Sequence, residues 1–421
     1  MDFSQALAAI DALKPTGMLM GLERMRRLLA LLGSPQDTLK VVHVAGTNGK
    51  GSTARMIQCM ATAAGWRTGL YASPAVTGIR DTITIDGVPI PEADFAALTE
   101  EILALRPRLE EVGGLSEFEL TTAMAYGYFA RKGTQLCIVE CGLGGREDAT
   151  NVLSAPLLAV LTPIALDHTA ILGDTLEAIA ANKCGILKPP AGVVTAPGQA
   201  AEALGVILEE AARKGVTVYS PNGAAATLLE EGLGGLRFSY GSQSYSLPLT
   251  GAFQMENALT ALEAVRLLGN LGFPIAEDAR KRGLAEATMP CRQEVVSRHP
   301  LRILDGAHNP HGVAALRDSL VKYLPGAPLT MVMGMLRDKD TAACAALLGP
   351  LCSRVICCTP DNPRALDAAE LAELIRPCCR QVEVIPDPEA AWRQAVSTAG
   401  DTPVLAAGSF YLCACLRPLL T

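Results

Sequence analysis

Short apolar runs alternate with stretches of helical character along the chain. Residues 41–45 form a β-branched run with the length of a buried strand, and residues 52–64 favour a helix that ends at Gly65. The strand pattern recurs at 68–72, 136–140 and 157–161, and helical patterns cover 92–109, 117–131 and 175–187. Strands separated by helices predict an α/β fold built on a doubly wound sheet.

Other stretches vary this alternation. Residues 82–90 have the pattern of a β-ribbon broken at Asp86-Gly87, and residues 236–249 that of a hairpin around Gly241-Ser242. Residues 4–32 predict two helices around Pro15-Thr16-Gly17. Residues 192–220 predict another strand, helix and strand, and two further helices are expected after Gly251 and over 277–287.

The alternation becomes more regular beyond a hinge that we expect at residues 289–292. Strand patterns there cover 301–304, 329–333, 355–358, 382–385 and 404–407, each followed by a helical segment. A chain of 421 residues also exceeds the usual size of one core. We therefore expect two domains, residues 1–290 and a smaller α/β domain of residues 291–421.

Composition narrows the class of protein. The chain is 49% hydrophobic and 19% charged, with a net charge of −7, which disfavours nucleic acid or an anionic membrane as partner. The N-terminus lacks the pattern of a signal peptide, and no 18-residue apolar segment predicts a membrane span. The 13 cysteines include no C-x-x-C pair, which fits reduced thiols. We expect a cytoplasmic monomer.

The loop after the first strand has the composition of a nucleotide phosphate site. It consists of Gly46, Thr47, Asn48, Gly49, Lys50, Gly51 and Ser52. Its glycines let the backbone wrap a phosphate, the following helix offers free N–H groups, Lys50 neutralises charge and Ser52 can hold magnesium. The spacing departs from G-x-x-x-x-G-K-[ST], because Gly51 separates lysine and serine. The alternative is a glycine-rich turn without a ligand.

Polar residues with candidate roles follow later strands. Glu140 ends a buried run, where a carboxylate would be a second magnesium ligand beside a phosphate loop; the alternative is an edge glutamate in water. His168 and Lys183 are candidates whose alternatives are a structural histidine and a solvated lysine. The segment 305–310 is an acidic, histidine-bearing turn, or a plain Asp/Asn turn before a proline-started helix.

Taken together, these motifs resemble the bacterial folylpolyglutamate synthase and dihydrofolate synthase family, within the Mur ligase superfamily. The resemblance extends over nearly the whole chain. It rests on residues 43–52, 117–121, 139–140, 142–151, 166–168, 183–188, 305–310, 338–340 and 408–411, with Gln254, Asn257 and Arg292.

The resemblance implies a P-loop NTPase-like Mur ligase domain joined to a smaller Rossmann-like C-terminal domain. Lys50 and the loop amides would hold the ATP phosphates. Magnesium, with two ions expected, would be bound by Ser52, Glu140, His168 and Lys183, the last as a carbamate that turns a cation into an oxygen ligand. ATP would be held between the two domains by Asn257, Arg292, Asp305 and His308. The second substrate would bind at Ser73 and Pro74.

The implied activity is an ATP-dependent ligase. ATP would phosphorylate the carboxylate of dihydropteroate or of a reduced folate, and the amine of L-glutamate would attack the acyl phosphate. The catalytic residues would be Lys50, His168, Lys183 and Arg292. The alternatives are a Mur-type amide ligase with another acid acceptor, a P-loop NTPase switch, or a folate-binding protein without catalysis.

Several positions depart from the family pattern. The pterin-side motif, usually Ser-Pro-His-Leu and later Phe-Asn-Glu-Arg, is Ser-Pro-Ala-Val at 73–76 and Ile-Arg-Asp-Thr at 79–82. The usual histidine before Gln254 is Phe253, and the usual glutamate before the carbamylated lysine is Asn182. Neither of the last two changes removes a proposed metal ligand. The sequence leaves open which folate is the acceptor.

Overall fold

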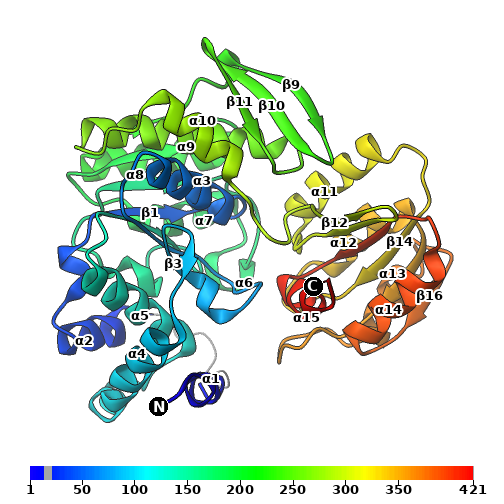
Figure 1. Cartoon of the computed structure of the whole chain (residues 1–421), viewed down its shortest axis with the longest axis horizontal. Helices are drawn as coiled ribbons and strands as arrows, with labels where there is room; N and C mark the ends of the chain where they lie inside the picture. Colours follow the sequence, from blue (N-terminus) through cyan, green and yellow to red (C-terminus); the bar gives the residue numbers. More distant parts are fainter. Residues whose placement is uncertain (14–20, 421) are drawn as a thin grey trace.

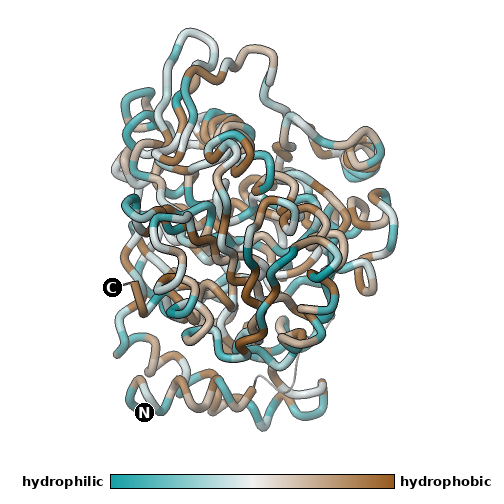
Figure 2. Tube along the Cα trace, turned by 90° about the vertical axis from the view of Figure 1, so that its right-hand side faces the viewer, coloured by the Kyte–Doolittle hydropathy of each residue, from teal (hydrophilic) through white to brown (hydrophobic). Residues whose placement is uncertain are grey.

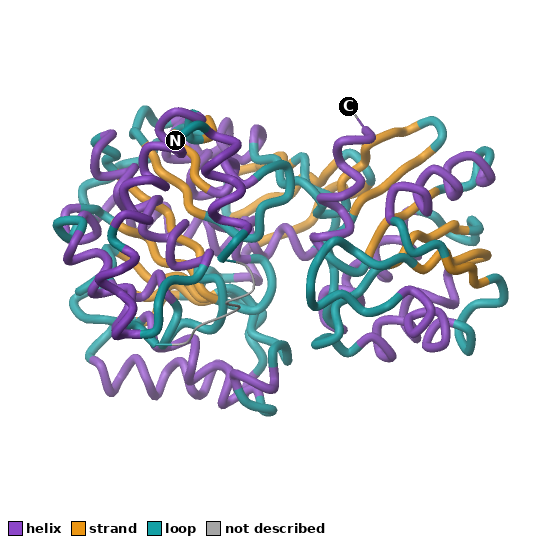
Figure 3. Tube along the Cα trace, turned by 90° about the horizontal axis from the view of Figure 1, so that it is seen from below, coloured by secondary structure: helices purple, strands orange, loops and turns teal. Residues whose placement is uncertain are grey.

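The structure is a computed structural model that describes residues 1–13 and 21–420. The chain forms two bodies side by side (Figure 1), each with strands enclosed by helices (Figure 3). The larger body holds an eight-stranded and a three-stranded sheet, and the smaller holds a six-stranded sheet. The α/β fold class is confirmed. No helix of the described residues is long and apolar enough to cross a membrane.

The eight-stranded sheet has the order β4-β3-β2-β5-β1-β6-β7-β8. Its strands are β1 Val41–Ala45, β2 Thr68–Tyr71, β3 Ile83–Ile85, β4 Val88–Pro89, β5 Leu136–Glu140, β6 Leu158–Leu161, β7 Gly192–Thr195 and β8 Val218–Tyr219. Strand β1 pairs in parallel with β5 and β6. Strands β3 and β4 are the antiparallel ribbon expected at 82–90. The carboxyl ends of β1 and β5 therefore lie side by side.

Helices cover both faces of this sheet. They are α1 Phe3–Asp11, α2 Glu23–Leu31, α3 Lys50–Ala63, α4 Glu92–Ala104, α5 Glu117–Lys132, α6 Thr169–Leu172, α7 Leu176–Lys183, α8 Ala201–Lys214, α9 Phe253–Asn270 and α10 Glu277–Glu286. Val42 and Val44 pack with α3, α9 and α10, whereas Val41 and Ala45 face the helices of the other side. Apolar stretches accordingly run through the interior of the trace (Figure 2).

The three-stranded sheet is antiparallel and covers one side of α9 and α10. It has the order β11-β10-β9, with β9 Ala226–Gly232, β10 Gly235–Tyr240 and β11 Gln243–Leu247. The expected hairpin is β10 and β11. Strand β9 was not predicted, because it is an edge strand in which apolar and polar residues show little alternation. Its Leu229 is exposed.

The smaller body is a six-stranded sheet of order β12-β13-β17-β14-β15-β16. Its strands are β12 Glu294–Arg298, β13 Leu301–Leu304, β14 Leu329–Met333, β15 Cys352–Cys357, β16 Val382–Val384 and β17 Val404–Ala407. Helices α11 Pro310–Tyr323, α12 Thr341–Leu348 and α13 Ala368–Ile375 pack on one face, and α14 Pro388–Ala399 and α15 Phe410–Leu416 on the other. The antiparallel edge strand β12 was not expected.

Two predicted helices are shorter in the structure. Helix α4 ends at Ala104, and a 3-10 helix over Arg106–Val112 follows, because Pro107 cannot continue the hydrogen bonding of an α-helix. Helix α7 ends at Lys183 and continues as a 3-10 helix over Cys184–Ile186. The break expected at Pro15-Thr16-Gly17 lies outside the described residues. The expected boundary at residues 290 and 291 stays a prediction.

Candidate active site

The glycine loop leaves the carboxyl end of β1 and leads directly into α3. Gly46 and Gly49 have φ of +151° and +83°. A Cβ at Gly46 would lie 1.9 Å from Thr162 Oγ1, and one at Gly49 would lie 2.2 Å from Asn257 Oδ1. Both positions therefore require glycine, for backbone conformation and for space. The loop exposes the N-terminus of a 14-residue helix, an environment that binds anions.

Glu140 lies beside this loop at the end of β5. Its side chain is 5% exposed and its Oε1 is 4.0 Å from Lys50 Nζ. Its Oε2 is buried and has no hydrogen-bond partner among residues 1–13 and 21–420. Burial raises the pKa of Glu140 to about 7, against the opposing charges of Lys50 and Arg292. A buried carboxylate oxygen without a donor fits a cation ligand, and Ser52 is also buried in the first turn of α3.

Lys183 approaches the same loop from the end of α7. Its side chain is buried, and its Nζ donates a hydrogen bond to Gly46 O at 2.8 Å. Burial, with the charge of Lys50, lowers the pKa of Lys183 to about 7. A large fraction of this amine is therefore neutral and nucleophilic near pH 7. The neighbouring Asn182 has a buried Oδ1 without a partner.

His168 has its contacts on the other body of the molecule. Lys339 Nζ lies 3.1 Å from His168 Nε2 and 2.7 Å from Asp167 Oδ1, and Asp338 Oδ2 lies 3.9 Å from His168 Nδ1. Burial lowers the pKa of His168 to about 4, so the ring is neutral. Within residues 1–13 and 21–420, no hydrogen bond or ion pair joins His168 to Glu140.

The glycine loop itself touches the smaller body. Asn48 Nδ2 lies 3.0 Å from His311 Nδ1, and Asn309 Nδ2 donates to Asn48 Oδ1 at 3.2 Å and to Asp167 Oδ2 at 2.9 Å. Asn309 is also the N-cap of α11, accepting from Gly312 N. His308 Nε2 is 3.7 Å from Asp167 Oδ2. The phosphate loop is thus bonded directly to the N-terminus of α11.

Arg292 and Asp305 lie where the chain enters the smaller body. The Arg292 guanidinium stacks over Phe410, 4.4 Å from the ring centroid, and its Nε is buried without a partner. Asp305 accepts hydrogen bonds from Gln293 N at 2.8 Å and Ala307 N at 2.6 Å. Beside them is a cavity of about 480 Å³, lined by Arg292 and Met289 among others.

Ser73 and Pro74 follow β2, and the Ser73 backbone lies close enough to Glu140 to lower the pKa of that carboxyl against the effect of burial. Val76 packs against the apolar cluster of α14 and α15 in the smaller body. Arg80 donates to Ile90 O at 3.2 Å and pairs with Glu92. The altered segment 73–82 therefore bridges Glu140 and the smaller body.

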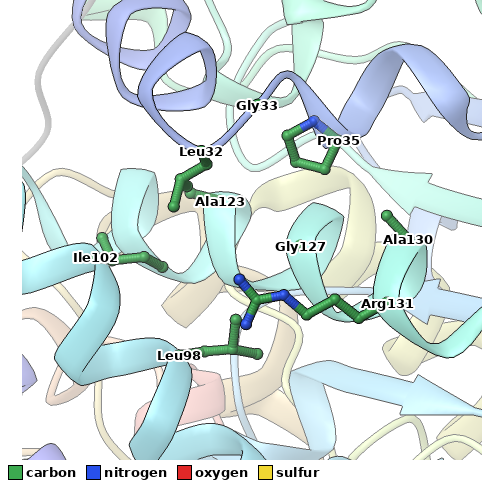
Figure 4. Close-up of a pocket in the computed structure, with 9 residues that line it drawn as sticks. All are labelled: Leu32, Gly33, Pro35, Leu98, Ile102, Ala123, Gly127, Ala130 and Arg131. Carbon is green, nitrogen blue, oxygen red and sulfur yellow. The ribbon is translucent and has the colours of Figure 1, made fainter.

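A second cavity lies away from the glycine loop. It has a volume of about 250 Å³ and is lined mainly by apolar residues after α2 and on α4 and α5, including Leu98 and Ile102 (Figure 4). Its charged residue, Arg131, is paired with both carboxylate oxygens of Glu101. We assign this cavity no role in the site.

The structure groups the expected residues into two sets. The larger body contributes Lys50 and Ser52 of the glycine loop, with Glu140 and Lys183 beside it. The smaller body contributes Arg292, Asp305 and His308. Asn257 packs against Gly49 and donates to Gln254 Oε1 at 2.9 Å. The sequence analysis gave no role to the residues that join the sets: Asp167, Asn309, His311 and Lys339. Residues 338–340 are a single Asp-Lys-Asp run, and no local pattern in it singles out Lys339.

Replacing Glu140 by glutamine is expected to stabilise the metal-free protein at alkaline pH. The folded-state pKa of Glu140, about 7, lies above its ordinary value of 4.5, so stability falls as pH rises from 4.5 through 7. Glu140→Gln removes that loss, about 3 kcal/mol at pH 8 and almost nothing near pH 4. Urea unfolding at both pH values measures the difference in the free energy of unfolding between the wild type and Glu140→Gln. Magnesium should raise the melting temperature of the wild type only; an equal rise in Glu140→Gln would contradict this ligand.

Comparison with known proteins gives the family. Residues 44–265 match the Mur ligase middle domain, and residues 291–410 match the Mur ligase glutamate ligase domain. The dihydrofolate synthase/folylpolyglutamate synthase of Bacillus subtilis is 37% identical, with 84% of each chain covered. The folylpolyglutamate synthase of Lacticaseibacillus casei is 33% identical over 100% of this chain and 99% of its own.

Solved structures agree with these relatives. Folylpolyglutamate synthase of Mycobacterium tuberculosis, complexed with ADP and AMPPCP, superimposes with a TM-score of 0.89 at 32% identity over 99% of each chain. Escherichia coli FolC, in complex with DHPP and ADP, gives 0.87 at 30% identity over 100% of this chain and 98% of that one. The chain therefore belongs to the folylpolyglutamate synthase and dihydrofolate synthase family of the Mur ligases and is an ATP-dependent amide ligase.

Proposed function

We propose that this ligase joins the amine of L-glutamate to the carboxylate of a folate, either the terminal glutamate of a reduced folate or dihydropteroate. One observation carries the proposal: the phosphate loop is bonded through Asn48 to Asn309 and His311 of the second α/β body. That contact creates a site between two domains, where closure can hold ATP and exclude water.

Nucleotide binding follows from the two sets of residues. The amides of residues 46–52 and the N-terminus of α3 bind the phosphates, and Lys50 neutralises their charge. Asn257, Arg292, Asp305 and His308 contact ATP from the hinge and the smaller domain. Arg292 supports this arrangement, because its buried Nε has no hydrogen-bond partner among the described residues.

Magnesium fits the donors beside the loop. We propose that Ser52 and Glu140 hold the first of two ions, and that a carbamate on Lys183 contributes oxygen ligands together with His168. The unpartnered Glu140 Oε2 and the buried amine of Lys183 support this set. His168 would exchange its contact with Lys339 for the metal site. Bound magnesium offsets phosphate charge during phosphoryl transfer.

The reaction makes a poor acyl donor reactive. A carboxylate oxygen of the folate attacks the γ-phosphorus of ATP, the bond to the ADP oxygen breaks, and an acyl phosphate forms. The glutamate amine then attacks the acyl carbon, the carbon–oxygen bond to phosphate breaks, and the amide, phosphate and one proton are released. Lys50 and Arg292 stabilise the charge on the transferring phosphoryl group.

The acceptor is proposed to enter beside Ser73 and Pro74. The contact of the Ser73 backbone with Glu140 supports this place, because the acceptor carboxylate must reach the γ-phosphate. The relative solved with DHPP supports a pterin acid as acceptor.

We further propose a cytoplasmic monomer divided at residues 290 and 291. The free thiols of all 13 cysteines, each in a described residue, fit a reducing compartment.

Phosphate release is expected to depend on both acceptor substrates. Purified protein with ATP and magnesium should release phosphate rapidly only when L-glutamate and a pterin acid are both present, and mass spectrometry should detect the new amide. Dihydropteroate and tetrahydrofolate, assayed side by side, identify the acceptor. Hydrolysis that ignores both acceptors would instead indicate an NTPase switch, and amide formation on a peptidoglycan-precursor nucleotide alone would indicate another Mur-type ligase.

A further inference from the structure

The turn between β9 and β10 reaches from the larger domain to the smaller one (Figure 1). Leu233, in this turn, packs against the apolar cluster that contains Val313, Leu316 and Leu320 of α11. Gly235, two residues after Leu233, has φ of +111°, and a Cβ there would lie 2.2 Å from Leu247 O. The turn therefore has a backbone shape that few other residues could adopt.

Glu231, two residues before Leu233, makes a polar contact at the same place. Its side chain is 7% exposed, it accepts a hydrogen bond from Tyr323 Oη at 3.2 Å, and it pairs with Lys322 Nζ. Both partners are at the C-terminal end of α11. A buried carboxylate that accepts one hydrogen bond and pairs with one ammonium resists separation, because parting leaves its charge without compensation.

Tyr323 also contacts a second segment of the larger domain. Its hydroxyl lies close enough to the backbone of Gly251, just before α9, for that backbone to lower the pKa of Tyr323 against the opposing effect of burial. Helix α9 carries Asn257, which packs against Gly49 of the phosphate loop. The C-terminal end of α11 is thus fixed to the larger domain at Glu231 and at Gly251.

The N-terminal end of α11 is fixed to the same domain at the nucleotide site. Asn309 and His311 contact Asn48 of the phosphate loop. The helix spans 14 residues, so its two attachments are separated by about 20 Å at 1.5 Å per residue. A helix of this length moves largely as a rigid body, so a shift at one end displaces the other.

We propose that Glu231 is a positioning residue for the nucleotide site, acting through α11. By holding Lys322 and Tyr323, it sets the helix and hence the segment 305–311 against the phosphate loop. This inference rests on the proposed function, because it assumes that ATP binds between the loop and that segment. Glu231 itself touches neither the loop nor the Asp305 segment.

Removing this contact should weaken nucleotide binding from a distance. Glu231→Ala and Tyr323→Phe are each expected to raise the dissociation constant for AMPPCP by about fivefold, the lower end of typical coupling between sites. Glu231→Gln keeps an acceptor for Tyr323 and should fall between wild type and Glu231→Ala. Calorimetric titration measures the constants, and circular dichroism checks folding.

Glu230→Gln is the matched control. Glu230 is the preceding residue of β9, but its side chain is 66% exposed and pairs with Arg237 inside the same sheet. It should bind AMPPCP as the wild type does. Tyr323→Phe removes one hydroxyl only, so it tests the proposal even if Glu231→Ala folds poorly.

A double-mutant cycle tests transmission along the helix. Asn48→Ala removes the contacts of Asn309 and His311 with the phosphate loop. If Glu231 acts through these contacts, the fold-changes in AMPPCP affinity caused by Asn48→Ala and by Glu231→Ala should combine to less than their product. Multiplicative effects, or unchanged binding in both Glu231→Ala and Tyr323→Phe, would overturn the inference. A wild type that fails to bind AMPPCP would instead refute the proposed nucleotide site.

Discussion

Replacing Lys50 by methionine is expected to reduce kcat by about 10²- to 10³-fold, as the loss of one preorganised donor at a developing negative charge does in other enzymes. Lys50 Nζ donates to Thr47 O at 3.2 Å and lies 4.0 Å from Glu140 Oε1, so it faces both the loop and the metal carboxylate. Methionine keeps much of the length and apolar stem but removes the charge. Acceptor-dependent phosphate release measures the effect.

Lys40→Met provides the control for this substitution. Lys40 is exposed and directly precedes β1, the strand that leads to the loop, and its change should leave kcat within about twofold, as expected for a surface residue. The two variants should melt within a few degrees of each other, because neither removes a core contact. If Lys50→Met keeps more than a tenth of the wild-type rate, the loop does not serve the phosphoryl transfer proposed here.

The phosphate loop was predictable because its signal is local. A buried strand, seven residues of loop and the helix start are contiguous, and each has a distinct composition. Glu140 was predictable as a site residue for a related reason. Parallel strands place their carboxyl ends at one edge of a sheet, and β5 proved to be a direct neighbour of β1.

Contacts between the domains were not predictable from spacing. Lys339 reaches Asp167 across 172 residues, and Asn309 reaches Asn48 across 261. Nothing in the local sequence of Lys339 distinguishes it from a solvated lysine beside two aspartates. The edge strands β9 and β12 were missed for a similar reason, because a strand exposed on several sides lacks the alternation that marks a half-buried one.

The family resemblance and the structure give His168 different neighbours. Sequence similarity implies a role at the metal centre, whereas here its Nε2 faces Lys339 Nζ at 3.1 Å. Asp167, next to it, is held by the smaller domain: burial alone would raise its pKa, but the His308 ring and Lys339 keep the pKa well below its usual range. The positions of both side chains therefore depend on how the two domains are placed relative to each other, as well as on the metal site.

Lys183 is expected to carry a carbamate in the active protein. Its buried amine, with a pKa lowered to about 7 by burial and by Lys50, is largely neutral above that pH and can attack carbon dioxide. Native mass spectrometry in bicarbonate should show the added mass of one carbon dioxide, which acidification should remove. Lys183→Ala should lose about 10²-fold in kcat, because the metal site loses an anionic ligand.

Lys188 provides the comparison within the same segment. It is also partly buried, but its ammonium donates to Asn151 O at 2.9 Å and to Leu153 O, so a carbamate there would forfeit a hydrogen bond. Peptide mapping should find Lys188 unmodified, and acetate should restore activity to Lys183→Ala but not to Lys50→Met. An active wild type whose Lys183 stays unmodified in bicarbonate would refute the carbamate. The P-loop assignment would then stand on Lys50 and Glu140 alone, since their geometry at the loop does not depend on Lys183.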